Sequence, residues 1–458
     1  MSPSTDMDGR TLRTRARRFF VSLLTSLVFL FLDFLDASLC VLYRFLDAFI
    51  EGKPSPCYCD KNRAGERSSA SGGDEESEVS ESLYGRRNVF REMGMLRLVE
   101  RWDLSGSAGR VVTNHRSRWS DCGCDSCVSW ACSGALKLHV VVQEPLPGDF
   151  SVQVQKAPEN VIFVHGFLSS SSLWTESVFP NLSESARANY RLFAVDLLGF
   201  GRSPKPRDCA YTLKDHLGMI ERSVIIPYRL NSFHLVAHSM GCIIALALAA
   251  EYTESVASIT LIAPPYFPSS ESNASLTALE KIAEKRLWPP LLFGSAVMSW
   301  YEHLGRCVCF LVCRNHRTWE RILKLVTRRS DLHFSLIDLT RHTHHSALHT
   351  MHNVICGGMK FMDNYLEGLR KSRARIVIFH GDRDEVVPME CSDNIKMKIP
   401  HAEVDIIPNA NHTRVILGRE KALTRKLEHV WARFAGLGQE SDRGAYIFRK
   451  SSNPASNS

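Results

Sequence analysis

One stretch decides the fold of this chain: Phe233-His-Leu-Val-Ala-His-Ser-Met-Gly241, followed by Cys242-Ile-Ile-Ala-Leu-Ala-Leu-Ala-Ala250. It predicts a short apolar strand, a tight turn that carries Ser239, and a buried helix. Such a turn lifts a serine hydroxyl above the end of a sheet, and it requires small neighbours because strand and helix nearly touch. Ala237 and Gly241 meet this requirement, although Ala237 stands where the first glycine of the G-x-S-x-G pattern usually lies.

Two later strands supply the partners that this serine needs. A buried parallel strand is predicted over Arg375–His380, and it leads into Gly381-Asp-Arg-Asp384. The next strand is predicted over Ala402–Ile407 and precedes His412. Serine, carboxylate and histidine, in this order and each after a strand, form the chain order of the α/β-hydrolase fold. The sequence therefore predicts this fold, a mostly parallel sheet with helices on both faces.

The predicted chemistry is acyl transfer through a serine. His412 is expected to take the proton of Ser239 and later return it to the leaving group, while a carboxylate holds the imidazole in one tautomer. Two aspartates compete for the carboxylate role. We assign it to Asp384, which lies further out on the loop and can face His412, and we interpret Asp382 as a turn or capping residue.

Two backbone amides are expected to form an oxyanion hole. One is the N–H of Met240, and the other is the N–H of Phe167, in the turn after the apolar segment Val161–Val164. Gly166 lets this backbone approach a substrate without a Cβ. His165 is interpreted as a residue that packs and hydrogen-bonds to order the loop, and not as a proton-transfer group.

Length and composition favour one large α/β unit with attachments. The chain has 458 residues, 44% of them hydrophobic, and a mild formal charge of +7. It has no basic stripe with interleaved aromatic residues, which argues against a nucleic-acid partner. We predict a signal peptide or signal-anchor at 1–50 and a flexible polar spacer at 51–117. A hydrolase core follows at 118–265 and 366–436, interrupted by a helical cap at 266–365. A tail at 437–458 ends the chain.

The cap is predicted from the distance between two strands. About 110 residues separate the predicted strand Ser258–Ala263 from the one at Arg375, which is more than a crossover helix needs. Helices of this interval could line an acyl pocket, or they could simply pack on the core. The interval also places His345, His349 and His352 on one helical face, and we interpret these as packing or surface histidines rather than a zinc site.

The N-terminus predicts export or membrane attachment. Five arginines between Arg10 and Arg18 precede an almost wholly apolar run from Phe19 to Leu32, as in a signal sequence or signal-anchor. The basic side would face the cytosol and send the rest across the membrane. Either a signal peptide is cleaved near Ala37 to Cys40, or the segment stays as a membrane-associated helix. A soluble amphipathic helix is the remaining alternative.

Cysteine usage fits an exported protein. Several of the 14 cysteines cluster, at Cys57 and Cys59, at Cys122, Cys124, Cys127 and Cys132, and at Cys307, Cys309 and Cys313. In an oxidising compartment these would mostly form disulfides. Cys124 and Cys127 make one Cys-x-x-Cys pair, but no second pair follows at standard spacing. We therefore predict no metal site, and the serine chemistry calls for no organic cofactor.

The chain resembles the plant BODYGUARD-type α/β-hydrolases. The resemblance covers most of residues 118–436 and the apolar N-terminus. It rests on long motifs: Arg118-Trp-Ser-Asp-Cys122, Val164-His-Gly-Phe-Leu-Ser-Ser-Ser171, Ala194-Val-Asp-Leu-Leu-Gly199, Ser203-Pro-Lys-Pro206, Leu235-Val-Ala-His-Ser-Met-Gly-Cys242, Ser299-Trp-Tyr-Glu-His303 and His349-Thr-Met-His-Asn353.

The resemblance implies an exported protein of epidermal cells that acts in or near the cell wall, or at the outer face of the plasma membrane, in forming the cuticle. It implies a lysophospholipase-like or acyl-transferring enzyme, and its motif matches at Ser239, Asp384 and His412. The leading hypothesis is a serine acyl hydrolase or acyltransferase acting on an acyl glycerol, a lysophospholipid or a hydroxy-fatty-acid ester. The alternatives are a non-catalytic, receptor-like protein that binds a lipid or signal molecule, and a structural wall protein.

Overall fold

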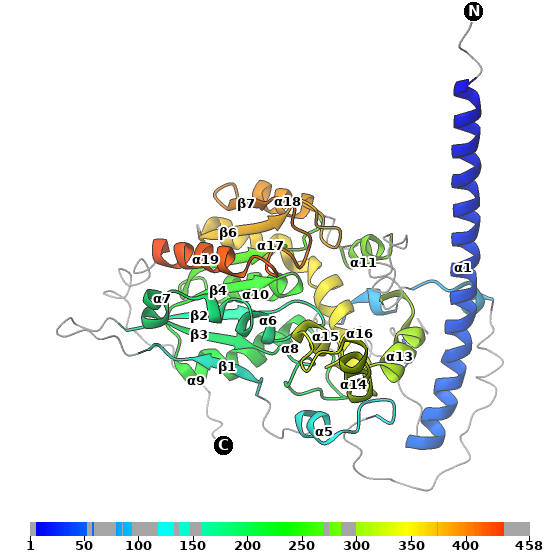
Figure 1. Cartoon of the computed structure of the whole chain (residues 1–458), viewed down its shortest axis with the longest axis horizontal. Coiled ribbons are helices and arrows are strands. Elements are labelled where there is room, and N and C mark those ends of the chain that lie inside the picture. The colour runs from blue at the N-terminus through cyan, green and yellow to red at the C-terminus, as the bar shows by residue number, and fades with distance from the viewer. Residues whose placement is uncertain are drawn as a thin grey trace, which may run out of the picture. The chain divides into compact units, whose positions relative to one another are not determined.

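The structure is a computed structural model of the chain (Figure 1). It describes residues 6–52, 57–58, 79–84, 86–93, 118–131, 137–146, 157–268, 274–284, 299–372 and 374–434. The predicted tail at 437–458 and most of the predicted spacer lie outside the described residues. The chain divides into two compact units, a sheet unit (residues 137–197, 217–268 and from 361 onward) and a helical unit (residues up to 136, 198–216 and 269–360).

A seven-stranded sheet forms the centre of the sheet unit (Figure 1). Its strands are β1 (Val140–Gln143), β2 (Glu159–Val164), β3 (Tyr190–Val195), β4 (Phe233–His238), β5 (Val256–Ile262), β6 (Ile376–Gly381) and β7 (Glu403–Ile407), in the spatial order β1-β3-β2-β4-β5-β6-β7. Only the pairing of β1 with β3 is antiparallel. Because central parallel strands are covered on both faces, they are continuous hydrophobic runs, and every residue of β4 is buried.

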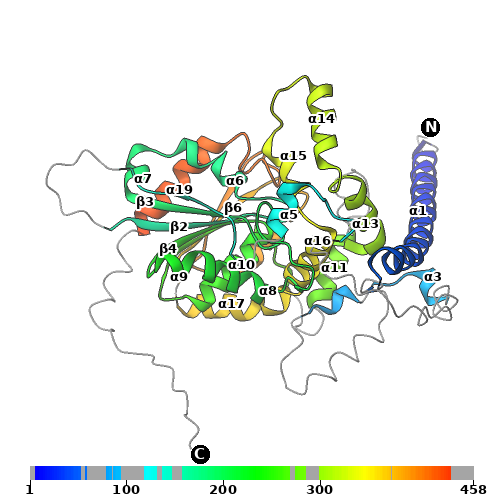
Figure 2. The same cartoon turned by 90° about the horizontal axis from the view of Figure 1, so that it is seen from below.

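Helices cover both faces of this sheet. Figure 2 shows α9, α10 and α17 on one side of the strands and α6, α7 and α19 on the other. Their bounds, with those of the remaining helices of this part of the chain, are α6 (Ser172–Thr175), η2 (Phe179–Asn181), α7 (Glu184–Asn189), α8 (Leu213–Ile220), η3 (Glu221–Ile225), α9 (Ile226–Tyr228), α10 (Met240–Glu251), α17 (Met359–Lys371), α18 (Glu390–Lys398) and α19 (Glu420–Phe434). The apolar helix α10 is buried from Met240 to Ala249, as expected of a helix that is hydrophobic all round. The predicted α/β-hydrolase architecture is confirmed.

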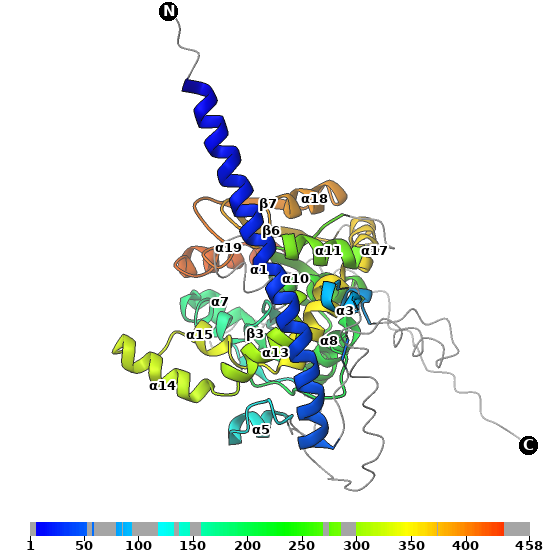
Figure 3. The same cartoon turned by 90° about the vertical axis from the view of Figure 1, so that its right-hand side faces the viewer.

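The helical unit joins the N-terminal part of the chain to the long insertion. Its helices are α1 (Asp6–Glu51), η1 (Glu81–Leu83), α3 (Val89–Glu92), α5 (Asp125–Ala131), α11 (Ala274–Glu284), α13 (Glu302–Leu311), α14 (His316–Thr327), α15 (Phe334–Asp338), α16 (His344–Thr350) and η5 (Met351–Cys356). Figure 3 shows α1 running past α13 and α3, and both pairs are in contact. The predicted cap, 266–365, is helical in its described residues, and its position over an active site stays a prediction.

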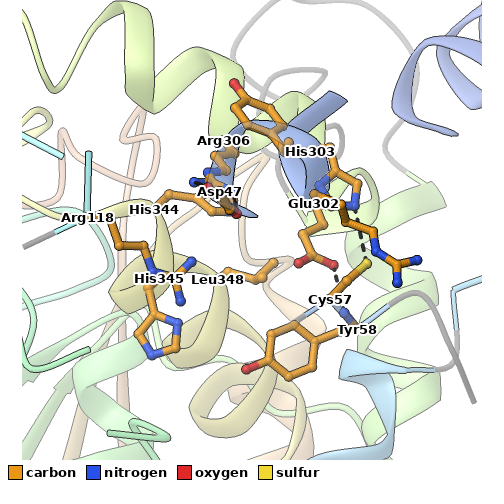
Figure 4. A pocket seen from close by; sticks show the side chains of 12 residues that line it. Asp47, Cys57, Tyr58, Arg118, Glu302, His303, Arg306, His344, His345 and Leu348 are labelled. Atoms are coloured by element: carbon orange, nitrogen blue, oxygen red, sulfur yellow. Dashed lines mark hydrogen bonds and ion pairs between the residues drawn. The ribbon is translucent and has the colours of Figure 1, made fainter. Parts of the chain in front are cut away.

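Buried ion pairs tie the second half of α1 to the rest of the helical unit. Asp47 is 1% exposed and makes two 2.7 Å contacts with the guanidinium of Arg306, on α13. Asp36 is equally buried, pairs with Arg91, and accepts a 2.9 Å hydrogen bond from the backbone N–H of His303. Figure 4 shows Asp47 and Arg306 at the small cavity that residues of α1, α13 and α16 line. The second half of α1 is therefore part of the fold.

One face of α1 stays apolar and exposed. The stretch Ser26–Glu51, most of it in the second half of the helix, is long and apolar enough to cross a membrane. Exposed large apolar side chains lie upstream of Asp33, among them Phe20 and Phe31, and they continue downstream at Phe45 and Phe49. The second half of α1 therefore buries its acidic face and exposes an apolar one.

Two of the predicted boundaries need correction. The spacer predicted over 51–117 contains packed residues at 79–84 and 86–93, where Leu83 is fully buried and Arg86 pairs with the buried Glu302 at 3.1 Å. Sequence composition did not reveal this because the partner lies more than 200 residues away. In addition, residues 118–136 and 198–216, predicted as hydrolase core, belong to the helical unit.

The histidines of the insertion satisfy backbone carbonyls. Nε2 of His345 donates to Cys209 O at 3.0 Å, and Nδ1 of His349 donates to Ala210 O at 3.3 Å. Nε2 of His352 donates to the carbonyl oxygen of Ser299 at 3.1 Å. Packing and hydrogen bonding therefore explain these three rings.

Candidate active site

A strained turn carries Ser239. Strand β4 ends at His238 and helix α10 begins at Met240, and Ser239 between them has φ 52° and ψ −124°. A residue other than glycine seldom adopts a positive φ, and such strain clusters at functional sites. A Cβ on Gly241 would lie 2.5 Å from the carbonyl oxygen of His165, so only glycine fits there. The predicted elbow is present, and Ala237 fits as a fully buried residue.

Three predicted side chains meet at the carboxyl ends of the strands. The hydroxyl of Ser239 donates to Nε2 of His412 across 2.9 Å. Nδ1 of the same ring donates to Oδ2 of Asp384 across 2.8 Å. The three residues come from the loops after β4, β7 and β6, so the parallel sheet brings them to one edge. The arrangement is a complete hydrogen-bonded relay from hydroxyl to carboxylate.

Asp384 is held as a buried anion. Its side chain is fully buried, and Oδ1 accepts 2.9 Å hydrogen bonds from the backbone N–H groups of Val386 and Val387. Burial alone would raise the pKa of this carboxyl, but hydrogen bonds from His380 and His412 outweigh it and hold the pKa well below its usual range. Asp384 therefore carries a negative charge that can stabilise an imidazolium at position 412.

Asp382 joins two loops instead. Its Oδ1 accepts a 3.3 Å hydrogen bond from the N–H of Ala410, two residues before His412. A Cβ on the neighbouring Gly381 would lie 2.2 Å from the carbonyl oxygen of Ala410, so the acid loop and the histidine loop touch at backbone level. This placement agrees with the interpretation of Asp382 as a turn residue.

The loop after β2 lies against the serine. A Cβ on Gly166 would come within 3.1 Å of the Ser239 Cβ, so the glycine lets this loop lie close to the serine, and its approach to a substrate stays a prediction. His165 is fully buried, donates from Nδ1 to the carbonyl of Gly166 at 2.7 Å and accepts from the N–H of Leu197 at 2.9 Å. Burial lowers its pKa, so the ring is neutral. It orders the loop that carries Phe167, and the oxyanion role of the Phe167 and Met240 amides stays a prediction.

Sequence reasoning missed two supporting histidines. Nε2 of His238 donates to the backbone carbonyl of His412 at 3.1 Å, and burial lowers the pKa of His238 to about 3. His380 is fully buried, donates from Nε2 to Val387 O at 3.0 Å, and lies 3.5 Å from the carboxylate of Asp384. Both residues end predicted strands. A histidine as the last residue of an apolar strand is the signal that could have found them.

The arrangement can perform acyl transfer. It offers a nucleophile with an adjacent general base and a buried charge behind that base. Among the described residues, the Cys and His groups that could hold a metal lie in the helical unit.

Comparison with known proteins agrees with this geometry. Residues 159–288 match the family model of the alpha/beta hydrolase fold. Probable lysophospholipase BODYGUARD 4 of Arabidopsis thaliana is 52% identical over 412 residues, which cover 89% of this chain and 96% of that protein. Probable lysophospholipase BODYGUARD 5 of the same plant is 49% identical over 422 residues, covering 88% and 94%. The family expected from the motifs is confirmed: this chain belongs to the BODYGUARD family of α/β-hydrolase-fold proteins.

Proposed function

We propose that the chain is a serine acyl hydrolase or acyltransferase that acts on lipid esters. The observation that carries the proposal is the unbroken relay from the strained Ser239 through His412 to the buried Asp384. A hydroxyl that donates to an imidazole, itself held by a buried carboxylate, is the arrangement that activates serine for attack on a carbonyl.

The reaction proceeds through an acyl-enzyme. As Oγ of Ser239 bonds to the ester carbonyl carbon, its proton passes to Nε2 of His412, and Asp384 stabilises the imidazolium. The N–H groups of Phe167 and Met240 receive the developing oxyanion. The C–O ester bond then breaks, and the leaving alcohol takes the proton from His412. Water or a lipid hydroxyl next attacks the acyl-enzyme, and the same proton transfers restore the serine.

The relatives support the proposed lipid class. The proteins that share about half of their residues with this chain are named probable lysophospholipases. We accordingly favour lysophospholipids, with acyl glycerols and hydroxy-fatty-acid esters as further substrates, and a role in building the plant cuticle. Transfer of the acyl group to a second lipid would need an acceptor hydroxyl to reach the acyl-enzyme before water does.

We further propose that the N-terminal helix is retained as a membrane anchor. Arginines precede the long apolar part of α1, so the rest of the chain would lie on the far side of the membrane from the cytosol. Cleavage near Ala37 to Cys40 would remove Asp36, whose buried pair with Arg91 belongs to the folded helical unit. The N-terminus of the mature protein, read by mass spectrometry after purification from plant tissue, tests this. A sequence that starts at residues 38–41 would contradict retention.

The test of the enzymatic proposal is a lipid panel. Purified full-length protein is given lysophospholipids, acyl glycerols and hydroxy-fatty-acid esters, and lipid analysis follows both hydrolysis and transfer products. We expect turnover of at least one class by the wild type and by Ser330→Ala, which changes an exposed serine, and none by Ser239→Ala. Folded wild-type protein that binds a lipid tightly without turning it over would instead support a receptor-like role.

A further inference from the structure

We propose that Cys122, Cys124, Cys127 and His316 form a structural zinc site. The three cysteines lie just before and within α5, and His316 is the first residue of α14; all four belong to the helical unit. Each offers one ligand atom, and the four atoms lie within 4.8 Å of one another. Three thiolates and one imidazole are among the standard ligand sets of structural zinc.

The interatomic distances fit a tetrahedral ion. Nε2 of His316 lies 3.6 Å from Sγ of Cys124 and 3.5 Å from Sγ of Cys127. Zinc with Zn–S bonds of about 2.3 Å and a Zn–N bond of about 2.0–2.1 Å places sulfur and nitrogen about 3.6 Å apart at the tetrahedral angle. Hydrogen bonding alone explains the cluster less well, because one ring nitrogen makes one well-directed hydrogen bond, whereas two sulfurs lie beside Nε2 here.

The other nitrogen of the ring is already fixed. Nδ1 of His316 donates to Oε1 of Glu320, one helical turn later, at 3.1 Å. A carboxylate that accepts from the far nitrogen is the usual partner of a metal-ligating histidine, because it sets the tautomer and the ring orientation. Nε2 therefore faces the sulfurs of Cys124 and Cys127, and the His316 side chain is only 9% exposed.

Two other groups in the helical unit have three potential ligands each, so they support a structural zinc site less strongly. They are Cys309, Cys313 and His342, and Cys40, Cys57 and His303. Nδ1 of His342 is buried without a hydrogen-bond partner, so that ring lacks the carboxylate support of His316. Only the group on α5 and α14, among the described residues, combines four ligands with a supported imidazole.

The site would hold two distant segments together. Cys127 and His316 are 189 residues apart in the chain. A metal that joins them closes a long loop, and its binding free energy contributes to folding. A disulfide is the competing arrangement, but it would use two of the three sulfurs and leave the third thiol and the oriented imidazole without a function. In the structure all three cysteines are free thiols.

The test measures metal in the full-length chain. Wild-type protein and the variants Cys127→Ser and Cys307→Ser are purified without chelator, and their zinc content is measured by mass spectrometry. Cys307→Ser is the control, because Cys307 belongs to none of the three groups. We expect Cys127→Ser to hold one zinc ion per chain fewer than wild type, and Cys307→Ser to match wild type. His316→Cys keeps a complete ligand set and should retain the ion that His316→Ala loses.

A second measurement does not depend on the variants folding. In wild-type protein, alkylation mapped by peptide mass should spare Cys122, Cys124 and Cys127 until a chelator is added, and cobalt exchanged into the site should give thiolate charge-transfer and tetrahedral d–d absorption. Equal zinc in the Cys127 and Cys307 variants would overturn the proposal. So would a disulfide between any two of these three cysteines in metal-free, folded wild-type protein. Neither readout involves esterase activity, so the zinc site and the catalytic proposal fail independently.

Discussion

The two units of this molecule encode their structure differently. In the sheet unit, short contiguous motifs fix the functional residues: Ser239, Asp384 and His412 each follow a strand of the sheet, and the parallel topology brings the strand ends to one edge. In the helical unit, the contacts that matter join residues far apart, as Asp47 does with Arg306 on α13. Local pattern suffices for the first unit, whereas long-range pairing of charged and sulfur-bearing side chains defines the second.

The largest expected effect lies in the sheet unit. Ser239→Ala should lower kcat on a lipid ester at least ~10³-fold, because it removes the hydroxyl that forms the proposed acyl-enzyme. Steady-state kinetics measures this, with Ser330→Ala as the control for an unrelated serine. A variant that kept more than a tenth of wild-type turnover would show that chemistry takes place elsewhere.

The second prediction separates the two aspartates. Asp384→Asn should lower kcat by about 10²- to 10⁴-fold, because an amide that donates to Nδ1 favours the wrong tautomer of His412. Asp382→Asn keeps an oxygen that can accept from the N–H of Ala410 and should lose less than about tenfold. Both variants are compared by kcat at pH 7 with thermal melts as a check on folding. The reverse ranking would mean that Asp382 is the acid of the relay.

The third prediction moves to the helical unit. Asp47→Ala leaves Arg306 as a buried, unpaired charge and should lower the free energy of unfolding by about 3–5 kcal/mol. The matched change in the sheet unit is Asp405→Ala, which removes a partly exposed ion pair with Lys426 and should cost about 0–1 kcal/mol. Denaturant titration of both variants measures the two losses in the free energy of unfolding. Equal effects would refute the view that buried long-range pairs define the helical unit.

The smallest expected effect concerns pH. Burial lowers the pKa of His345 to about 2 and that of His349 to about 4, whereas both would titrate near 6.5 in the unfolded chain. Below pH 6.5 the unfolded state binds more protons, down to about pH 4 for His349 and about pH 2 for His345. The free energy of unfolding should therefore fall as pH falls through this range and be highest above it.

The variant His345→Gln keeps a donor for the carbonyl of Cys209 but cannot be protonated. It should flatten the dependence of stability on pH below 6.5 by up to about 1.4 kcal/mol per pH unit. Melting temperatures of both proteins at pH 5 and pH 7.5 measure the difference. If the melting temperature of the variant falls between pH 7.5 and pH 5 as much as that of the wild type, the His345 ring does not contribute to the acid sensitivity.

Sequence reasoning reached the fold and the three central residues because hydrophobic strands and the residues that end them are local features. It did not reach His238 and His380, because a histidine at the end of an apolar strand marks only a candidate and does not reveal the group to which its ring donates. It also mistook residues 79–93 for spacer, because the buried partner Glu302 lies on a helix far along the chain. The Cys124–Cys127 pair was recognised and interpreted as no metal site, because nothing in the local sequence points to His316 on α14, whose imidazole lies beside these sulfurs.

The central claim is that His412 activates Ser239, and a fluorophosphonate probe tests it most directly. The wild-type protein should acquire one covalent adduct, which peptide mass mapping places on Ser239, and His412→Ala should react at least ~10²-fold more slowly. Folded wild-type protein that stays unlabelled, or an adduct that maps to another serine, would contradict the account.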